Sequence, residues 1–175
     1  MILPKSRRRI ESSCPAWVRL RMRFGSCVKA AWSRLFWRKA NGKPLLGICL
    51  GMQMLLEKSY EYGEHAGLGL IGGSVKPIAP MIGEGLKVPH IGWNRLIFPK
   101  GREKSKLFQY INEGDCVYFV HSYAGVDCDA FVSARTEYGA ELTAAVERGN
   151  VYGTQFHPEK SGEVGLQILK AFCEL

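Results

Sequence analysis

A cysteine between glycines is the residue of this sequence best placed to do chemistry. Cys49 is the centre of the Gly-Ile-Cys-Leu-Gly run at residues 47–51, with an apolar run before it at residues 44–46 and a helix-forming run after it at residues 52–58. Flanking glycines permit a sharp strand-to-helix turn that exposes the residue at its apex. Because the helix N-terminus there favours a thiolate, we predict that Cys49 is a nucleophile. The pentapeptide by itself fits a buried core cysteine equally well.

A histidine and a carboxylate occur together further along the chain. His157 and Glu159 flank Pro158 at the end of a strand-like run, and the proline keeps the pair out of a regular helix. A His-x-Glu sequence alone is typical of a polar surface. A thiol nucleophile, however, needs a base, and the base needs an acid that orients it. The combination predicts a catalytic triad of Cys49, His157 and Glu159.

These motifs resemble those of the triad-type (class I) glutamine amidotransferases. Three other stretches, residues 87–94, 118–123 and 159–161, narrow the resemblance to the glutaminase subunits of imidazole glycerol phosphate synthases, from about Gly42 to the C-terminus. The resemblance implies that Cys49 attacks the side-chain amide of glutamine, forms a thioester and releases ammonia and then glutamate. It also implies a partner, a cyclase subunit with a (β/α)₈ barrel. That partner would use the ammonia to make imidazole glycerol phosphate and an aminoimidazole carboxamide ribonucleotide in histidine biosynthesis.

The residues that follow Cys49 are candidates for binding glutamine. The N–H of Leu50 comes directly after the nucleophile at the helix start, so it is the expected oxyanion donor. By the resemblance, further donors come from a proline-glycine loop that this sequence does not contain. Gln53 and Glu57 lie four and eight residues after Cys49, so on a helix they would share its face and could hold the polar end of the substrate. A solvated helix face is an equal alternative for both.

Other residues have roles only through the resemblance. Backbone groups of His121, Ser122 and Tyr123 would contact glutamine, although His121 considered alone fits a structural histidine better. The positions expected to face the cyclase are Trp93, Asn94, Tyr118 and Lys160.

The order of apolar runs predicts an α/β fold. After the elbow and its helix at residues 52–58, a glycine-rich loop leads into residues 70–78, and a final helix follows Ser161 as N-cap with Val164, Ile168, Leu169 and Phe172 on one face. The other expected strands are residues 44–48, 91–98, 116–121, 131–135, 142–147 and 151–156. This order suits an open, partly parallel sheet with an antiparallel extension, and the resemblance implies the flavodoxin-like, mostly parallel sheet of class I amidotransferases, with helices on both faces, here N-terminally incomplete.

Size and composition limit the function classes. A chain of 175 residues that is 46% hydrophobic is long enough for one domain with a real core. No apolar run approaches the length of a membrane span. Its six cysteines lack metal-ligand spacing, which suits a reducing cytoplasm. We therefore expect a cytoplasmic protein with no metal, no membrane contact and no nucleic acid partner, and the resemblance implies a heterodimer that needs no cofactor.

The first forty residues differ from the rest. They contain eleven lysines and arginines against one acid, or +10, whereas residues 41–175 carry −2. A basic tract can be a nucleic-acid arm or a membrane-surface helix, but its apolar residues follow no helical or strand period. The neighbouring reading frame of residues 12–20 can spell Val-Leu-Pro-Gly-Val-Gly-Ala-Phe, the loop that the resemblance requires. We therefore expect a frameshifted tract at residues 1–40 and an amidotransferase domain at residues 41–175; the alternative is a divergent basic extension.

Two other functions stay open at this point. A different class I amidotransferase, serving nucleotide or cofactor synthesis, would share the triad, although the Gly-Trp-Asn run at residues 92–94 argues against it. A non-catalytic binding subunit would fit a chain whose oxyanion loop and first strand are absent, because one lost oxyanion donor costs about 2.7–4 kcal/mol of transition-state stabilisation.

Overall fold

The computed structural model describes residues 42–175. The basic tract, the shifted reading frame and the domain boundary at residue 41 concern residues outside this range, so these three expectations stay predictions. Among residues 42–175, no helix is both long and apolar enough to cross a membrane.

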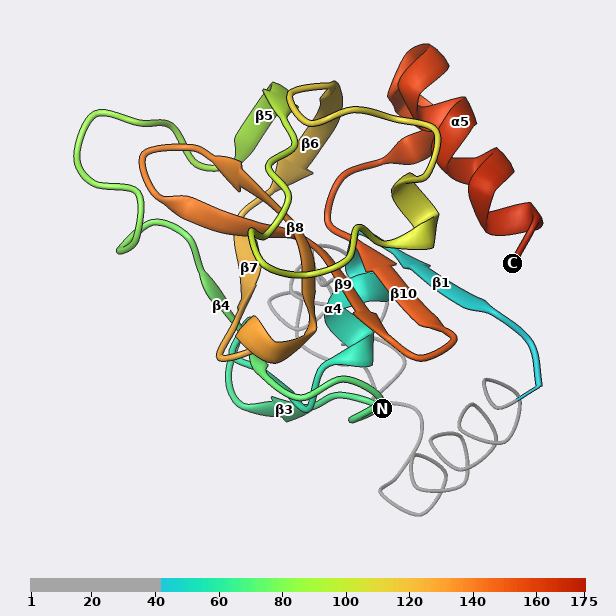
Figure 1. Cartoon of the computed structure of the whole chain (residues 1–175). Helices are drawn as coiled ribbons and strands as arrows, with labels where there is room; N and C mark the ends of the chain where they lie inside the picture. The colour runs from blue at the N-terminus through green and yellow to red at the C-terminus, as the bar shows by residue number, and fades with distance from the viewer. Residues whose placement is uncertain (1–41) are drawn as a thin grey trace, which may run out of the picture.

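The described residues form ten strands, two α-helices and three short 3-10 helices (Figure 1). The strands are β1 (Leu45–Ile48), β2 (Lys58–Ser59), β3 (His65–Ala66), β4 (Ser74–Pro77), β5 (His90–Arg95), β6 (Cys116–His121), β7 (Tyr123–Val126), β8 (Val132–Glu137), β9 (Glu141–Arg148) and β10 (Val151–Thr154). The helices are α4 (Leu50–Leu55), α5 (Gly162–Cys173), η1 (Lys106–Phe108), η2 (Asp129–Phe131) and η3 (Pro158–Lys160).

The strands pair in three groups. One sheet has the order β1-β10-β9-β8, a second has the order β3-β2-β4-β7, and β5 pairs with β6. Within the described chain, the pairs β1–β10 and β2–β4 are parallel and the other pairs are antiparallel. The α/β class is confirmed, while parallel pairing in this part of the chain is less extensive than expected, and β1 is an edge strand among these residues.

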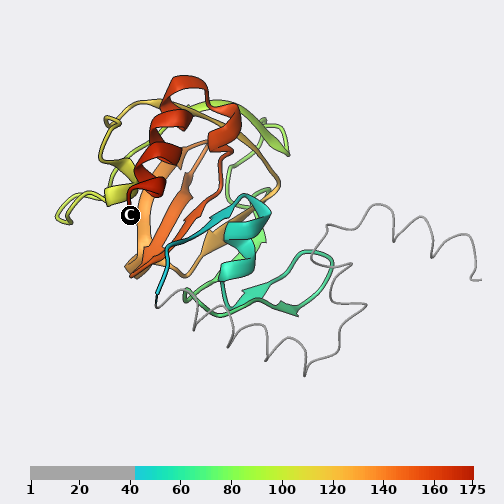
Figure 2. The same cartoon turned by 90° about the vertical axis from the view of Figure 1, so that its right-hand side faces the viewer.

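The two α-helices lie on opposite faces of the β1-β10-β9-β8 sheet (Figure 2). Successive residues of β10 show this directly, because side chains alternate across a strand. The ring of Tyr152 lies 6.3 Å from that of Phe172 on α5. A Cβ added to the next residue, Gly153, would lie 2.8 Å from the side chain of Met52 on α4. The site described below therefore lies at the edge of a sheet that is covered on both faces.

Most expected elements are present, with shifted ends. Strand β6 has the predicted bounds because its side chains alternate between buried and half-buried. Helix α4 begins two residues earlier and ends three residues earlier than predicted, since Leu56 is extended, with ψ 170°. The run at residues 70–78 forms a strand only from Ser74, because Gly73 adopts a φ of 118°. Ser161 is the N-cap of α5, but its hydroxyl does not cap the helix.

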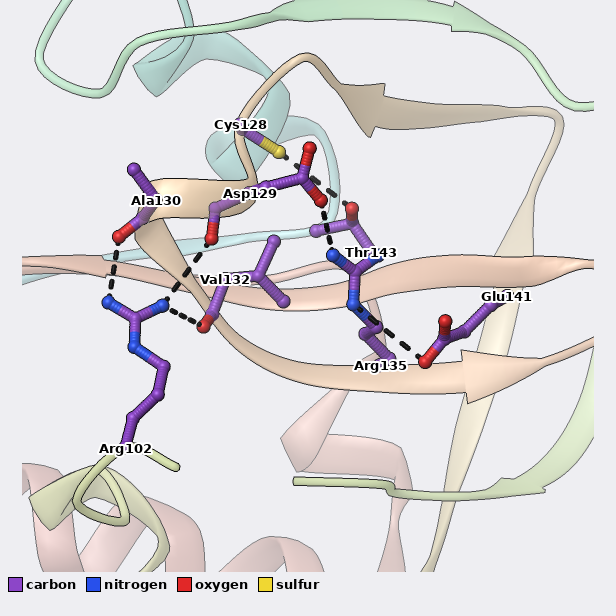
Figure 3. Close-up of polar contacts among 8 residues, drawn as sticks. All are labelled: Arg102, Cys128, Asp129, Ala130, Val132, Arg135, Glu141 and Thr143. Atoms are coloured by element: carbon purple, nitrogen blue, oxygen red, sulfur yellow. Dashed lines mark hydrogen bonds and ion pairs between the residues drawn. The ribbon is translucent and has the colours of Figure 1, made fainter. Parts of the chain in front are cut away.

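Polar contacts hold η2 against the β8–β9 pair (Figure 3). The guanidinium of Arg102 donates to the carbonyl oxygens of Ala130 at 2.8 Å and Val132 at 2.9 Å. Arg135 forms ion pairs with Asp129 and Glu141. Because Arg102 satisfies carbonyls that a short helix leaves open, these contacts stabilise the loop.

Candidate active site

Cys49 occupies a strained turn between β1 and α4. Its φ of 50° and ψ of −106° are unusual for a residue with a side chain, and such conformations persist where the surroundings impose them. Here its N–H donates to the carbonyl of Thr154 on β10 at 2.6 Å, and its carbonyl accepts from the N–H of Gln53 at 3.2 Å. This is the geometry of the predicted nucleophile elbow.

The two flanking glycines have different surroundings. A Cβ on Gly47 would lie 2.6 Å from the backbone carbon of Gly51 and 2.8 Å from the backbone nitrogen of Met52. Gly47 therefore allows α4 to fold back closely on β1. A Cβ on Gly51 would meet no atom within 4 Å, so space is open beside the first turn of the helix.

The strand pairing brings the second motif to Cys49. Residues Ile48 and Thr154 are paired in the parallel β1–β10 ladder, so the segments that follow the two strands leave the same edge of the sheet. Nδ1 of His157 lies 2.6 Å from Oε1 of Glu159. The charges of this segment act on the Cys49 thiol, since Glu159 raises its pKa and Lys160 lowers it.

The electrostatics of Cys49 differ from the sequence-based expectation of a thiolate. Burial raises the pKa of the thiol above its usual value, and this outweighs the hydrogen bond from the Leu50 N–H, which lowers it. The sulfur is therefore a protonated thiol that needs a base. The Leu50 N–H acts on the sulfur as a hydrogen-bond donor, and its role as an oxyanion donor stays a prediction. Glu159 stays ionised: although burial raises its pKa, the His157 hydrogen bond holds it below its usual value.

A buried amide pair, which sequence reasoning missed, supports the nucleophile. Nε2 of Gln155 donates to Sγ of Cys49 at 3.7 Å, and Oε1 of Gln155 accepts from Nε2 of Gln53 at 3.0 Å. Gln53 also donates to the carbonyl of Tyr123 at 3.1 Å. Gln53 thus lies next to Cys49 as expected, but its amide protons already bind protein groups. Gln155 stands two residues before His157, and that proximity was the available signal for it.

Glu57 does not continue the face of α4. The helix ends at Leu55, so the helical spacing that placed Glu57 above Cys49 does not apply. Its side chain is exposed and accepts from the N–H of Gly73 at 3.4 Å. The argument for Glu57 from a shared helix face was therefore wrong.

The His121, Ser122 and Tyr123 segment runs between β6 and β7. The Ser122 carbonyl accepts from the N–H of Ile78 at 3.0 Å, and the Tyr123 carbonyl accepts from Gln53 and from Nδ1 of His121, at 2.8 Å. Burial lowers the pKa of His121 to about 4, although its bond to Tyr123 raises it. A neutral, structural His121 matches the interpretation from sequence.

Trp93, Tyr118 and Lys160 lie near one another around an exposed face. Trp93 is 56% exposed, and its ring contacts that of Tyr118 edge to face, with centroids 6.0 Å apart. Tyr118 accepts from the N–H of His157 at 2.9 Å, so it is joined to the segment that carries Lys160. Asn94 lies on the opposite face of β5, where it binds His90 at 2.7 Å. Of the four expected partner positions, three surround this face.

Within residues 42–175, no group of three or more histidine, cysteine, aspartate or glutamate side chains could hold a metal ion. The described site itself supplies a thiol, an imidazole and a carboxylate.

Comparison with known proteins agrees with this geometry. The model of the family described as glutamine amidotransferase class-I matches residues 25–174. The chain is 52% identical over 137 residues to "Imidazole glycerol phosphate synthase subunit HisH" of Wolinella succinogenes, covering 77% of this chain and 65% of that protein. It is 51% identical over 133 residues to the subunit of the same name from Aquifex aeolicus, covering 75% and 61%.

Among solved structures, the chain resembles "Structure of PurLQS from Thermotoga maritima" with a TM-score of 0.58 and 22% identity, covering 83% of this chain and 70% of that one. This likeness concerns the fold alone. The chain spans less than two thirds of the length of both curated relatives described above.

Proposed function

Because this chain belongs to the class-I glutamine amidotransferase family, we propose that it serves as the glutaminase subunit of an imidazole glycerol phosphate synthase. Relatives that carry this name are about half identical to it. The observation that supports the proposal is the parallel pairing of Ile48 with Thr154, because Cys49 and the hydrogen-bonded His157–Glu159 pair follow these two neighbouring strand ends.

In the proposed reaction, His157 removes the proton of the Cys49 thiol and the sulfur attacks the side-chain carbonyl carbon of glutamine. The tetrahedral oxyanion accepts a hydrogen bond from the Leu50 N–H. The C–N bond then breaks as His157 returns the proton to the departing ammonia. Water, activated by the same imidazole, hydrolyses the thioester to glutamate, while Glu159 orients His157 throughout.

The raised pKa of Cys49 supports this assignment of roles. A thiol that is protonated at rest depends on a neighbouring base, so catalysis requires the correct position of His157. Gln155 binds the Cys49 sulfur and Gln53 binds Gln155, and neither amide accepts a proton in the reaction. We assign them a positioning role.

The proposed partner is a cyclase subunit that consumes the ammonia, in a cytoplasmic heterodimer. The exposed face around Trp93 and Tyr118 is our candidate for its docking surface, with Lys160 beside it. Since the Tyr118 carbonyl binds the His157 N–H directly, a partner on this face would lie next to the proposed catalytic base.

A catalytically impaired binding subunit is the second candidate. The Leu50 N–H is a hydrogen-bond donor to the Cys49 thiol, and the proline-glycine loop expected to supply further oxyanion donors does not occur in this sequence. A missing second donor would cost about 2.7–4 kcal/mol of transition-state stabilisation.

Co-purification with a cyclase subunit and measurement of glutamate release separates the two candidates. The glutaminase predicts release by the complex and loss of that release in Cys49→Ala with unchanged complex formation. A complex that forms without releasing glutamate supports the binding subunit. Failure to bind any such cyclase, with no glutamate release, overturns both.

A further inference from the structure

A hydrogen-bonded chain with a buried centre, the His90–His121 contact, extends from the candidate site to strand β5. From the Tyr123 carbonyl, which Gln53 also binds, it runs to Nδ1 of His121 at 2.8 Å. Nε2 of His121 lies 3.0 Å from Nδ1 of His90, and Nε2 of His90 lies 2.7 Å from Oδ1 of Asn94. The Asn94 amide nitrogen donates to the Glu137 carbonyl at 2.9 Å.

His90 is held rigidly in the middle of this chain. It is 0% exposed. Its ring is stacked between Phe119, with centroids 4.9 Å apart, and Tyr138, with centroids 4.0 Å apart. Neither ring neighbour forms part of the hydrogen-bonded chain. The orientation of His90 is thus fixed by packing, while its two nitrogens serve two different partners.

The two ends of this hydrogen-bonded chain determine how many ring protons it needs for complete bonding. Both ends are backbone carbonyls, which only accept hydrogen bonds. Asn94 must therefore turn its NH₂ to Glu137 and its oxygen to His90. Complete bonding then requires a proton on Nδ1 of His121, one on Nε2 of His90 and one between the two rings.

Two neutral imidazoles carry two ring protons, so the chain is one proton short. Burial lowers the pKa of both rings, and together with the smaller effects of His90 and His157 it lowers that of His121 to about 4. A third proton is therefore absent at neutral pH. One of the three links must lack its proton. It is the Asn94 link when His90 is protonated on Nδ1, and the central link or the Tyr123 link when His90 is protonated on Nε2.

We infer that His90 is a positioning residue of the glutamine site, whose tautomer couples the Asn94 amide to the Tyr123 carbonyl. While Nε2 of His90 is protonated and donates to the Asn94 oxygen, His121 receives no hydrogen bond from His90. When the Asn94 oxygen no longer accepts from His90, the His90 proton moves to Nδ1 and is donated to Nε2 of His121. His121 then has a hydrogen bond at each nitrogen and fixes the Tyr123 carbonyl, which Gln53 also binds. The catalytic part of this inference rests on the proposed glutaminase function.

Asn94 is accessible to groups from outside. Together with Trp93 and Glu137 it lines a surface groove of about 660 Å³. A hydrogen-bond donor placed in this groove could take up the Asn94 oxygen. The chain thus provides a physical route from the β5 surface to Gln53, and through Gln155 to Cys49.

The chain is tested first by ¹⁵N NMR of the histidine rings in the full subunit at neutral pH, because protonated and bare ring nitrogens have distinct shifts. We expect two ring protons on the His90–His121 pair of the wild type. Asn94→Ala removes the acceptor for Nε2 of His90 and should give a His121 with both nitrogens hydrogen-bonded and Nδ1 protonated. Asn94→Asp, an obligate acceptor, should keep the His90 proton on Nε2 and give different His121 shifts.

Kinetics of the complex with the cyclase test the positioning role. His90→Phe keeps the stacked ring but removes both nitrogens, so kcat/KM for glutamine should fall about tenfold. His90→Asn places an amide near Nδ1 and should restore most of it, whereas His90→Gln reaches towards Asn94 and should not. Tyr138→Phe is the control, because it keeps the ring stacked on His90 while removing a bond to the Lys87 carbonyl, and its kcat/KM should be unchanged.

Three results would overturn the inference: three ring protons on the wild-type pair, identical His121 shifts in the two Asn94 variants, or equal kinetics for His90→Asn and His90→Gln at matched thermal stability. The NMR measurement does not depend on turnover. A wild-type complex without glutaminase activity would therefore refute the proposed function, while the ring shifts would still decide whether Asn94 and His121 are coupled.

Discussion

Ile48 and Thr154 are directly paired in the parallel ladder between β1 and β10. The Cys49 N–H extends that ladder by one bond, to the Thr154 carbonyl at 2.6 Å. After Cys49 the polypeptide turns into α4, and after Thr154 it continues to His157. The relative position of the thiol and the imidazole is thus set by backbone hydrogen bonds of the sheet rather than by mobile side chains, which is how preorganised sites are built.

Alkylation should separate Cys49 from the other cysteines. A glutamine-analogue electrophile should modify Cys49 first, because it combines the elbow and the open space at Gly51 with the proposed base, His157, on the segment after the paired strand β10. Cys173 is exposed, so Cys173→Ser is the background for measurement by peptide mass spectrometry. Equal modification of Cys116 or Cys128 in the folded protein would contradict the elbow interpretation.

Because the Cys49 pKa is raised by burial, labelling should depend on the base. His157→Gln should slow glutamine turnover by about 10²–10⁴-fold and should also slow modification of Cys49 at neutral pH. The matched variant Glu159→Gln keeps a hydrogen-bond acceptor for His157 and should lose less. Turnover in His157→Gln at the wild-type rate would remove the imidazole from the mechanism.

The two glycines of the elbow should respond differently to alanine. Gly47→Ala places a Cβ 2.6 Å from the Gly51 backbone, so it should destabilise the fold by about 1–3 kcal/mol and disturb the turn. Gly51→Ala meets no atom within 4 Å and, as a glycine-to-alanine change in a helix, should leave stability equal or up to about 1 kcal/mol higher. Chemical denaturation measures both. Equal destabilisation would refute the close approach of α4 to β1.

The sequence was informative where a function depends on local chemistry. The glycine pair, the strand-to-helix change and the His-Pro-Glu run each lie within a few residues, and the structure brings the two segments together. Gln155 and His90 were missed because their roles come from partners 102 and 31 residues away, which only the strand register reveals. Glu57 was misplaced because a propensity for helix at residues 52–58 does not show that Leu56 turns to an extended conformation.

Stability should fall in mildly acidic solution because of His121. Its pKa is lowered by burial from 6.5 to about 4, so between these values the unfolded chain binds more protons than the folded one. The contribution of the neutral, buried His121 to the free energy of unfolding should be fully present above about pH 6.5. The free energy of unfolding should fall by about 3 kcal/mol as the pH approaches 4. His90, whose pKa is also lowered by burial, adds to the same trend. His121→Asn, which keeps a donor for Tyr123, should flatten the slope in urea titrations.

Docking of the cyclase should depend on the exposed face beside the triad segment. Lys160 is exposed, follows Glu159 directly and belongs to the segment joined to Tyr118, so its charge can reach a partner seated on Trp93. Lys160→Ala and Trp93→Ala should each raise the Kd of the complex, Trp93 more, since aromatic anchors in desolvated patches contribute about 2 kcal/mol or more. Cys49 should stay modifiable in both.

Lys170→Ala is the matched control, because Lys170 lies on α5 over the ring of Tyr110, and the Kd of this variant should be unchanged. Titration calorimetry with the purified cyclase measures the three affinities, and equal Kd values for all of them and the wild type would remove this face as the docking surface.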